Sequence, residues 1–90
     1  MGNVIIKMKV MPTSPDVDLE PIKAKIIELV EAEKGILKPI ETEDIAFGLR
    51  ALIATFLWSE DKETSIIEDA ISNIKNVSSC QIIDFRREFG

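Results

Sequence analysis

The chain contains no histidine and only one cysteine, Cys80, among its 90 residues. Histidine is the side chain that most often serves as a general base or metal ligand near neutral pH. A single cysteine cannot form an intrachain disulfide, although secreted domains of this length usually carry several cysteines. Cys80 lies in an alternating, strand-like segment with no candidate base beside it, so we interpret it as a small buried apolar residue. These absences disfavour an enzyme and favour a cytoplasmic location.

Long apolar segments and an excess of basic residues are also missing. The longest nearly apolar run, Ala51 to Trp58, is far shorter than the roughly 20 residues needed to span a bilayer. The first residues lack the apolar stretch of a signal peptide. Acidic residues outnumber basic ones 16 to 11, for a formal net charge of −5, whereas nucleic-acid binders need clustered lysines and arginines. We therefore expect no membrane association, no direct binding of nucleic acid, and a protein partner.

The hydrophobic pattern predicts an α+β domain covering residues 1–90. Asp18 and Thr64 are the expected N-caps of two helices, and Gly35 is the expected stop of the first, after Lys34. Pro39 places the second predicted strand at a sheet edge. The order βαββαβ with right-handed crossovers gives a ferredoxin-like sandwich, a four-stranded antiparallel sheet (order 4-1-3-2) with two helices on one face. Strands are predicted at 4–11, 36–42, 49–58 and 77–85, and helices over 18–34 and 64–75.

The segment 49–58 is apolar on both of its alternating faces, so we expect it at the centre of the sheet. One face of the sheet meets the helices, and the other is open. Apolar residues on the open face, such as Ile53 and Leu57, are candidates for a partner surface or a dimer contact. Nothing in the sequence fixes the oligomeric state, and a monomer is expected.

Two acidic groups resemble parts of a cation site, but each has a simpler interpretation. Asp16 and Asp18 fit a turn followed by a helix N-cap. Glu41, Glu43 and Asp44 fit a solvated hairpin with negative charge. The four glycines are scattered and form no phosphate-binding loop. We therefore expect neither a metal ion nor a cofactor.

Two short motifs stand apart from this pattern. Phe47 and Gly48 fall at the expected tip of a hairpin, where a large aromatic ring is difficult to bury within its own domain. The ring either folds back over the sheet edge or stands out as a binding anchor, worth on the order of 2 kcal/mol or more. Arg86 and Arg87 are adjacent cations expected just past the last strand, and a solvated tail is their simpler interpretation.

Four segments, in this order and spacing, resemble archaeal translation elongation factor 1-beta over nearly the whole chain. They are Lys7 to Leu19, Ala46 to Leu52, Glu60 to Glu68 and Ile82 to Arg87. The resemblance implies a single nucleotide-exchange domain that takes part in protein biosynthesis. It further implies that the domain binds the aminoacyl-tRNA-carrying GTPase, elongation factor 1-alpha, and promotes exchange of its GDP for GTP. Such a factor makes and breaks no covalent bond, so the resemblance implies a regulator and not an enzyme.

The resemblance also implies roles for the two motifs. Phe47 and Gly48 match a pair that, in eukaryotic relatives, inserts into a pocket on the GTPase. Arg87, with Arg86 beside it, falls where those relatives carry a lysine that reaches toward the magnesium and phosphate site. An arginine has a planar fork of donors, which suits phosphate oxygens better than the point charge of a lysine does. The chain departs from the family there, and it continues with the tail 88–90.

Other functions of the same fold are alternatives. A ligand-sensing or oligomerisation module is the main one, because this fold hosts many functions. An RNA-recognition domain requires aromatic residues on the open sheet face and basic surroundings, and the net charge has the wrong sign. An acylphosphatase-like enzyme is disfavoured, because no phosphate-cradling loop with a nearby arginine follows the first predicted strand.

Overall fold

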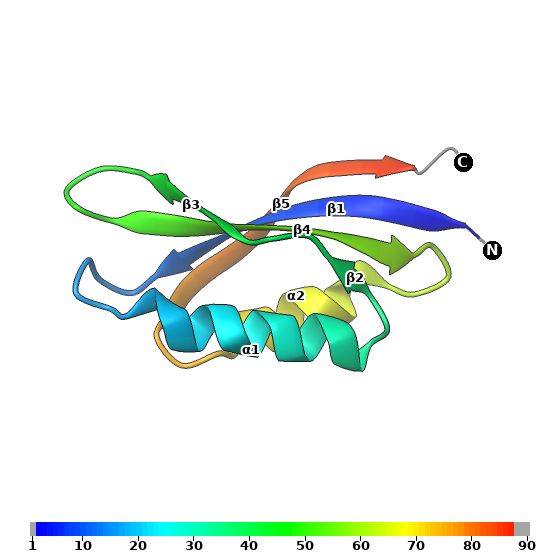
Figure 1. The fold of residues 1–90 in the computed structure, drawn as a ribbon, viewed down its shortest axis with the longest axis horizontal. Coiled ribbons are helices and arrows are strands. Elements are labelled where there is room, and N and C mark those ends of the chain that lie inside the picture. Colours follow the sequence, from blue (N-terminus) through cyan, green and yellow to red (C-terminus); the bar gives the residue numbers. More distant parts are fainter. Residues whose placement is uncertain (1, 88–90) are drawn as a thin grey trace.

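The computed structural model describes residues 2–87 and folds them into a five-stranded antiparallel sheet with two helices on one face (Figure 1). The strand order is β2-β4-β1-β5, and β3 also pairs with β4. The predicted α+β, ferredoxin-like fold is therefore confirmed. In chain order the elements are β1 (Asn3–Pro12), α1 (Leu19–Ala32), β2 (Ile36–Leu37), β3 (Glu41–Asp44), β4 (Arg50–Ser59), α2 (Thr64–Ser72) and β5 (Val77–Arg87).

The described residues form five strands where we predicted four, because the edge strand is divided into two pieces. β2 pairs with Phe56 and Leu57, and β3 pairs with residues 50–53, so both lie along the same side of β4. Between them, the Lys38 N–H still donates to the carbonyl oxygen of Thr55 at 2.8 Å. Pro39 then has no N–H to continue the ladder. The predicted order of the sheet is otherwise retained.

The hydrophobic core lies between the sheet and the helices. Alternate residues of β1 and β4 face the helices, and the Phe56 and Trp58 rings meet edge to face with their centroids 6.0 Å apart. Burial of each such side chain stabilises the fold by about 1.5–3 kcal/mol. The core comprises Val4, Ile6, Met8, Val10, Ile22, Ile26, Val30, Leu52, Ala54, Phe56, Trp58, Ile67 and Ile71.

The opposite face of the sheet carries no helix within residues 2–87 (Figure 1). Ile53 lies on this face but is only 8% exposed. Its cross-strand neighbours are Lys9 on β1 and Glu41 on β3, whose long side chains are able to cover apolar surface. Leu57 is half-buried. Contrary to our expectation, Ile53 therefore offers almost no surface to a partner.

The N-termini of the two helices differ in how they are capped. The Asp18 carboxylate accepts the N–H of Glu20 at 3.1 Å, so the predicted cap of α1 is confirmed. The predicted cap of α2 is wrong, because Glu63 occupies the N-cap position and Thr64 is the first helical residue. The Glu63 side chain makes no capping hydrogen bond. Neither helix of residues 2–87 has the length and apolarity required to cross a bilayer.

The C-terminus of α1 uses its glycine for close packing. Lys34, with a φ of 64°, adopts the left-handed conformation that commonly ends a helix. The Gly35 N–H donates to the carbonyl oxygen of Val30 at 2.9 Å. A Cβ atom on Gly35 would lie 2.7 Å from Cγ1 of Val30 and 3.1 Å from the carbonyl oxygen of Leu57. Glycine is required there because α1 and β4 approach each other too closely for a side chain.

Candidate partner-binding sites at the two ends of the molecule

A tight turn joins β3 to β4 and carries Phe47 at its tip. The Leu49 N–H donates to the carbonyl oxygen of Ala46 at 2.9 Å, and the two central residues both have positive φ, 55° for Phe47 and 80° for Gly48. Positive φ at both central positions is the mark of a type I′ hairpin turn. Glycine adopts this conformation readily, but for a bulky residue such as phenylalanine it costs on the order of 1–3 kcal/mol. The turn thus holds Phe47 in a strained conformation, a feature that concentrates at functional sites.

The Phe47 side chain is 95% exposed. The ring therefore does not fold back over the edge of the sheet, which was one of the two interpretations that the sequence left open. Ile45, in the same loop, is also partly exposed. An aromatic ring in this position gains the full free energy of desolvation only when another molecule covers it.

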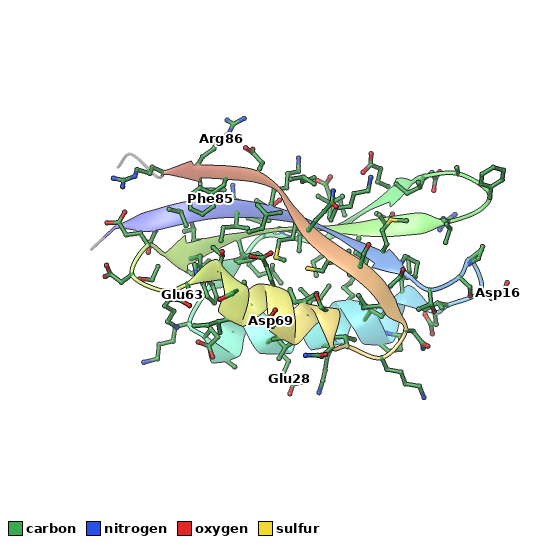
Figure 2. The ribbon with its side chains drawn as sticks, turned by 180° about the vertical axis from the view of Figure 1, so that it is seen from behind. Asp16, Glu28, Glu63, Asp69, Phe85 and Arg86 are labelled. Carbon is green, nitrogen blue, oxygen red and sulfur yellow. The ribbon has the colours of Figure 1, made fainter. Side chains whose placement is uncertain are left out.

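Contacts on both sides of the turn support the hairpin. At its base, Nε of Arg50 lies 3.3 Å from Oδ1 of Asp44, its cross-strand neighbour. Gly48 lies beside Pro15 in the β1–α1 loop. A Cβ atom placed on Gly48 would be 3.6 Å from Cβ of Pro15, which is ordinary van der Waals contact. An open groove of about 480 Å³ is lined by residues of this loop, of the start of α1 and of the hairpin. Asp16 marks the same end of the molecule (Figure 2).

The two arginines lie within the last strand and not past its end, which corrects our prediction. β5 extends to Arg87 because its pairing with β1 continues, with Arg86 opposite Ile5 and Arg87 opposite Val4. Arg86 points away from the helices (Figure 2), and its Nε lies 3.0 Å from Oδ2 of Asp84. Successive side chains of a strand point to opposite faces, so Arg87 lies on the helix side. The tail 88–90 is outside the described residues.

Phe47 and Arg87 are not brought together. The molecule measures 41 × 21 × 19 Å along its principal axes. The β3–β4 loop lies at one end of the long axis and the C-terminal end of β5 at the other (Figure 1). A single small pocket cannot receive both side chains.

Sequence reasoning missed Glu60, which lies in the β4–α2 loop beside Arg87. Oε2 of Glu60 is 3.9 Å from Nη1 of Arg87. The Gly2 N–H donates to Oε1 of Glu60 at 3.1 Å, and the Glu60 N–H donates to the carbonyl oxygen of Gly2 at 3.1 Å. No sequence signal distinguishes Glu60 from the other polar residues of its loop, because its contact with Arg87 depends on the pairing of β1 with both β4 and β5.

Cys80 is half-buried, and it faces Val10 across the β1–β5 ladder. Burial, together with the nearby charge of Glu68, raises the pKa of the Cys80 thiol to about 12. The thiol is therefore neutral near pH 7 and a poor nucleophile. Among residues 2–87, no group of three or more Cys, Asp or Glu side chains is placed to hold a metal ion.

A solved structure with the same architecture is the solution structure of the C-terminal domain of the MgtC protein from Mycobacterium tuberculosis. It superimposes with a TM-score of 0.72 and covers 97% of this chain and 89% of that one. The sequences are only 14% identical, so this likeness concerns the fold alone. It assigns the chain to the class of βαββαβ sandwiches.

Sequence comparisons are more specific. Residues 5–87 match the family model described as the EF-1 guanine nucleotide exchange domain. Elongation factor 1-beta of Methanobrevibacter smithii is 47% identical over 89 residues, covering 97% of this chain and 98% of the relative. That of Methanothermobacter thermautotrophicus is 42% identical over 88 residues, with 97% and 98% covered. The chain therefore belongs to the EF-1 guanine nucleotide exchange domain family, in its archaeal elongation factor 1-beta form, as the resemblance predicted.

Proposed function

We propose that the protein is a cytoplasmic guanine-nucleotide exchange factor that promotes exchange of GDP for GTP on elongation factor 1-alpha. Membership of the exchange-domain family supports this role. The observation that carries the mechanism is the exposed and conformationally strained Phe47 ring at the tip of the β3–β4 hairpin.

In this proposal Phe47 is the anchor for the partner. Its ring enters an apolar pocket on the GTPase, and Gly48 allows the turn to present it. Exposed aromatic residues dominate the energetics of many interfaces because they exclude much water at a small cost in conformational entropy. The Asp44–Arg50 pair and Pro15 hold the turn in place before the partner arrives, which lowers the cost of ordering the hairpin on binding.

At the other end, Arg87 acts on the nucleotide site of the partner. GDP is held largely through its phosphates and their magnesium ion, so a cation brought beside them competes with the metal. Arg86 and Arg87 are equally exposed, at 74% and 73%, but Arg86 lies 3.0 Å from the Asp84 carboxylate, whereas the ion pair of Arg87 with Glu60, within residues 2–87, is longer, at 3.9 Å. We therefore assign the main role to Arg87 and a supporting role to Arg86.

Exchange follows from linkage between the two binding events. A factor that prefers the nucleotide-free GTPase must weaken nucleotide binding by the same factor. A loss of about 4 kcal/mol corresponds to a factor of roughly a thousand in affinity. The Phe47 contact, at the opposite end of a 41 Å molecule from Arg87, supplies binding free energy far from the nucleotide, and no covalent step is needed.

The test is to load elongation factor 1-alpha with a fluorescent GDP analogue and to follow its release in excess unlabelled GDP. We expect the protein to accelerate release in a concentration-dependent and saturable way. An unrelated acidic domain of the same size serves as the control. A release rate that does not change with added protein would reject the proposed function.

A further inference from the structure

The β4–α2 loop is fixed to the body of the molecule by Lys62. Its Nζ lies 3.1 Å from Oε1 of Glu33, at the C-terminus of α1, and 5.3 Å from the centroid of the buried Trp58 ring. Trp58 in turn donates its Nε1–H to the carbonyl oxygen of Lys62 at 3.3 Å. An ion pair, a cation–π contact and a hydrogen bond thus hold the loop at one point.

Glu60 is held in the same loop by the start of β1. Its N–H and its Oε1 both bond to Gly2, each at 3.1 Å. The backbone bond extends the ladder that pairs Asn3 with Ser59, and the side-chain bond ties the carboxylate to the start of β1. The Glu60 side chain is only 29% exposed. One oxygen of its carboxylate is therefore already bonded to Gly2 before any partner binds, and Oε2 lies on the side of Arg87.

Arg87 has the opposite character. It is a long side chain, 73% exposed, on the last described residue of β5, and its Nη1 lies 3.9 Å from Oε2 of Glu60. A guanidinium has five N–H donors in a planar fork. A contact through one nitrogen leaves the remaining donors available for phosphate oxygens.

We infer that Glu60 is a positioning residue for Arg87, whose carboxylate, fixed by Gly2, orients the guanidinium to receive phosphate oxygens of the nucleotide bound to the partner. The inference rests on the proposed function. It assigns Glu60 no contact with the partner's nucleotide, because a carboxylate would repel the phosphates. Its effect is on the orientation of Arg87 and so on the rate of release within the complex.

The variant Glu60→Gln separates charge from packing, because the amide oxygen can still accept the Gly2 N–H. We expect the maximal release rate to fall roughly two- to fivefold, the range for an exposed ion pair, while the half-saturating concentration is unchanged. The fall should diminish at high salt, where charges are screened. It should be absent in an Arg87→Ala background. Glu63→Gln removes the same charge from the same loop and should behave as the unmodified protein.

A measurement on the free protein tests the same contact without the GTPase. The side-chain N–H resonance of Arg87, followed by ¹⁵N relaxation, should report greater mobility in Glu60→Gln than in Glu63→Gln. Unchanged mobility, an unchanged release rate or a faster release in Glu60→Gln would each overturn the inference and leave the proposed function standing, provided the unmodified protein accelerates release. If the unmodified protein does not accelerate release, both fail.

Discussion

The substitution Phe47→Ala removes the proposed anchor without touching the core. Because the ring is 95% exposed, its loss costs the fold almost none of the burial free energy that holds the sheet to the helices. Alanine meets the same penalty at positive φ as phenylalanine, so the substitution should change the free energy of unfolding by less than about 0.5 kcal/mol, as at other surface positions. Stability and partner binding are therefore separable at this position.

The size of the binding effect follows from the burial of one phenylalanine ring. Moving such a side chain from water into an apolar site is worth about 1.5–3 kcal/mol. Since every 1.4 kcal/mol is a factor of ten in affinity, Phe47→Ala should weaken the complex roughly tenfold to a hundredfold. At concentrations below saturation, the acceleration of GDP release should fall by at least a factor of ten.

The assay is the release of fluorescent GDP from elongation factor 1-alpha, measured over a range of exchange-factor concentrations. Ile36→Ala is a matched control, because it also removes an apolar side chain, 63% exposed, from the strand β2. We expect Ile36→Ala to match the unmodified protein, and Phe47→Ala to require at least ten times more protein for half-maximal acceleration. Urea unfolding of both variants, followed by Trp58 fluorescence, reports their stability.

Two results would refute this reasoning. If Phe47→Ala retains the half-saturating concentration of the unmodified protein, the ring contacts no pocket in the complex. If the variant instead loses several kcal/mol of stability, the ring supports its own fold, and any loss of exchange follows from unfolding.

Three further predictions concern other parts of the molecule. Arg87→Ala should lower the maximal rate of GDP release while the affinity for elongation factor 1-alpha, measured by calorimetry, stays the same; an equal loss of affinity would contradict the role assigned to it. Gly35→Ala should destabilise the fold by about 1–3 kcal/mol in urea unfolding, because the new Cβ would lie 2.7 Å from Cγ1 of Val30; unchanged stability would show that α1 shifts freely. At pH 8 the native Cys80 thiol, with a pKa of about 12, should react with iodoacetamide at least a hundredfold more slowly than in the unfolded chain. Because the pKa of Cys80 is higher in the folded state than in the unfolded chain, its contribution to the free energy of unfolding is complete below about pH 9 and declines toward pH 12. The loss of stability over this pH range should therefore be smaller in Cys80→Ala than in the unmodified protein.

The order of the elements could be predicted from the sequence because each element carries a local signal. The alternation in residues 49–58 and the helical spacing after Asp18 depend only on which side chains face the core. Pro39 correctly predicts that its segment lies at the sheet edge, but the residue itself lies between β2 and β3 and not within a strand. The division of the edge depends on which carbonyl oxygens of β4 are paired, and the sequence does not show this.

The error at the end of β5 and the omission of Glu60 both arise where tertiary pairing decides the outcome. β5 continues through Arg86 and Arg87 because β1 provides partners as far as Val4, although a pair of arginines in an acidic chain suggests a solvated tail. The contact between Glu60 and Arg87 joins the β4–α2 loop to the end of β5. These two segments lie side by side because β4 and β5 both pair with β1. In contrast, Phe47 and Gly48 could be identified from the sequence, because an aromatic ring at the expected tip of a hairpin is difficult to bury within its own domain.

β4 runs from the hairpin turn to the loop that lies beside Arg87. It starts at Arg50, just after the hairpin turn, and ends at Ser59, next to Glu60, after ten residues, which corresponds to about 33 Å of extended chain. Once the Phe47 contact has formed, this stiff spacer holds Arg87 near the nucleotide site of the GTPase at a high local concentration. An isolated hairpin peptide would lack this advantage even with its ring intact. The length of β4 thus sets the distance between the two sites on a partner, one for Phe47 and one for Arg87, that the domain is able to reach at the same time.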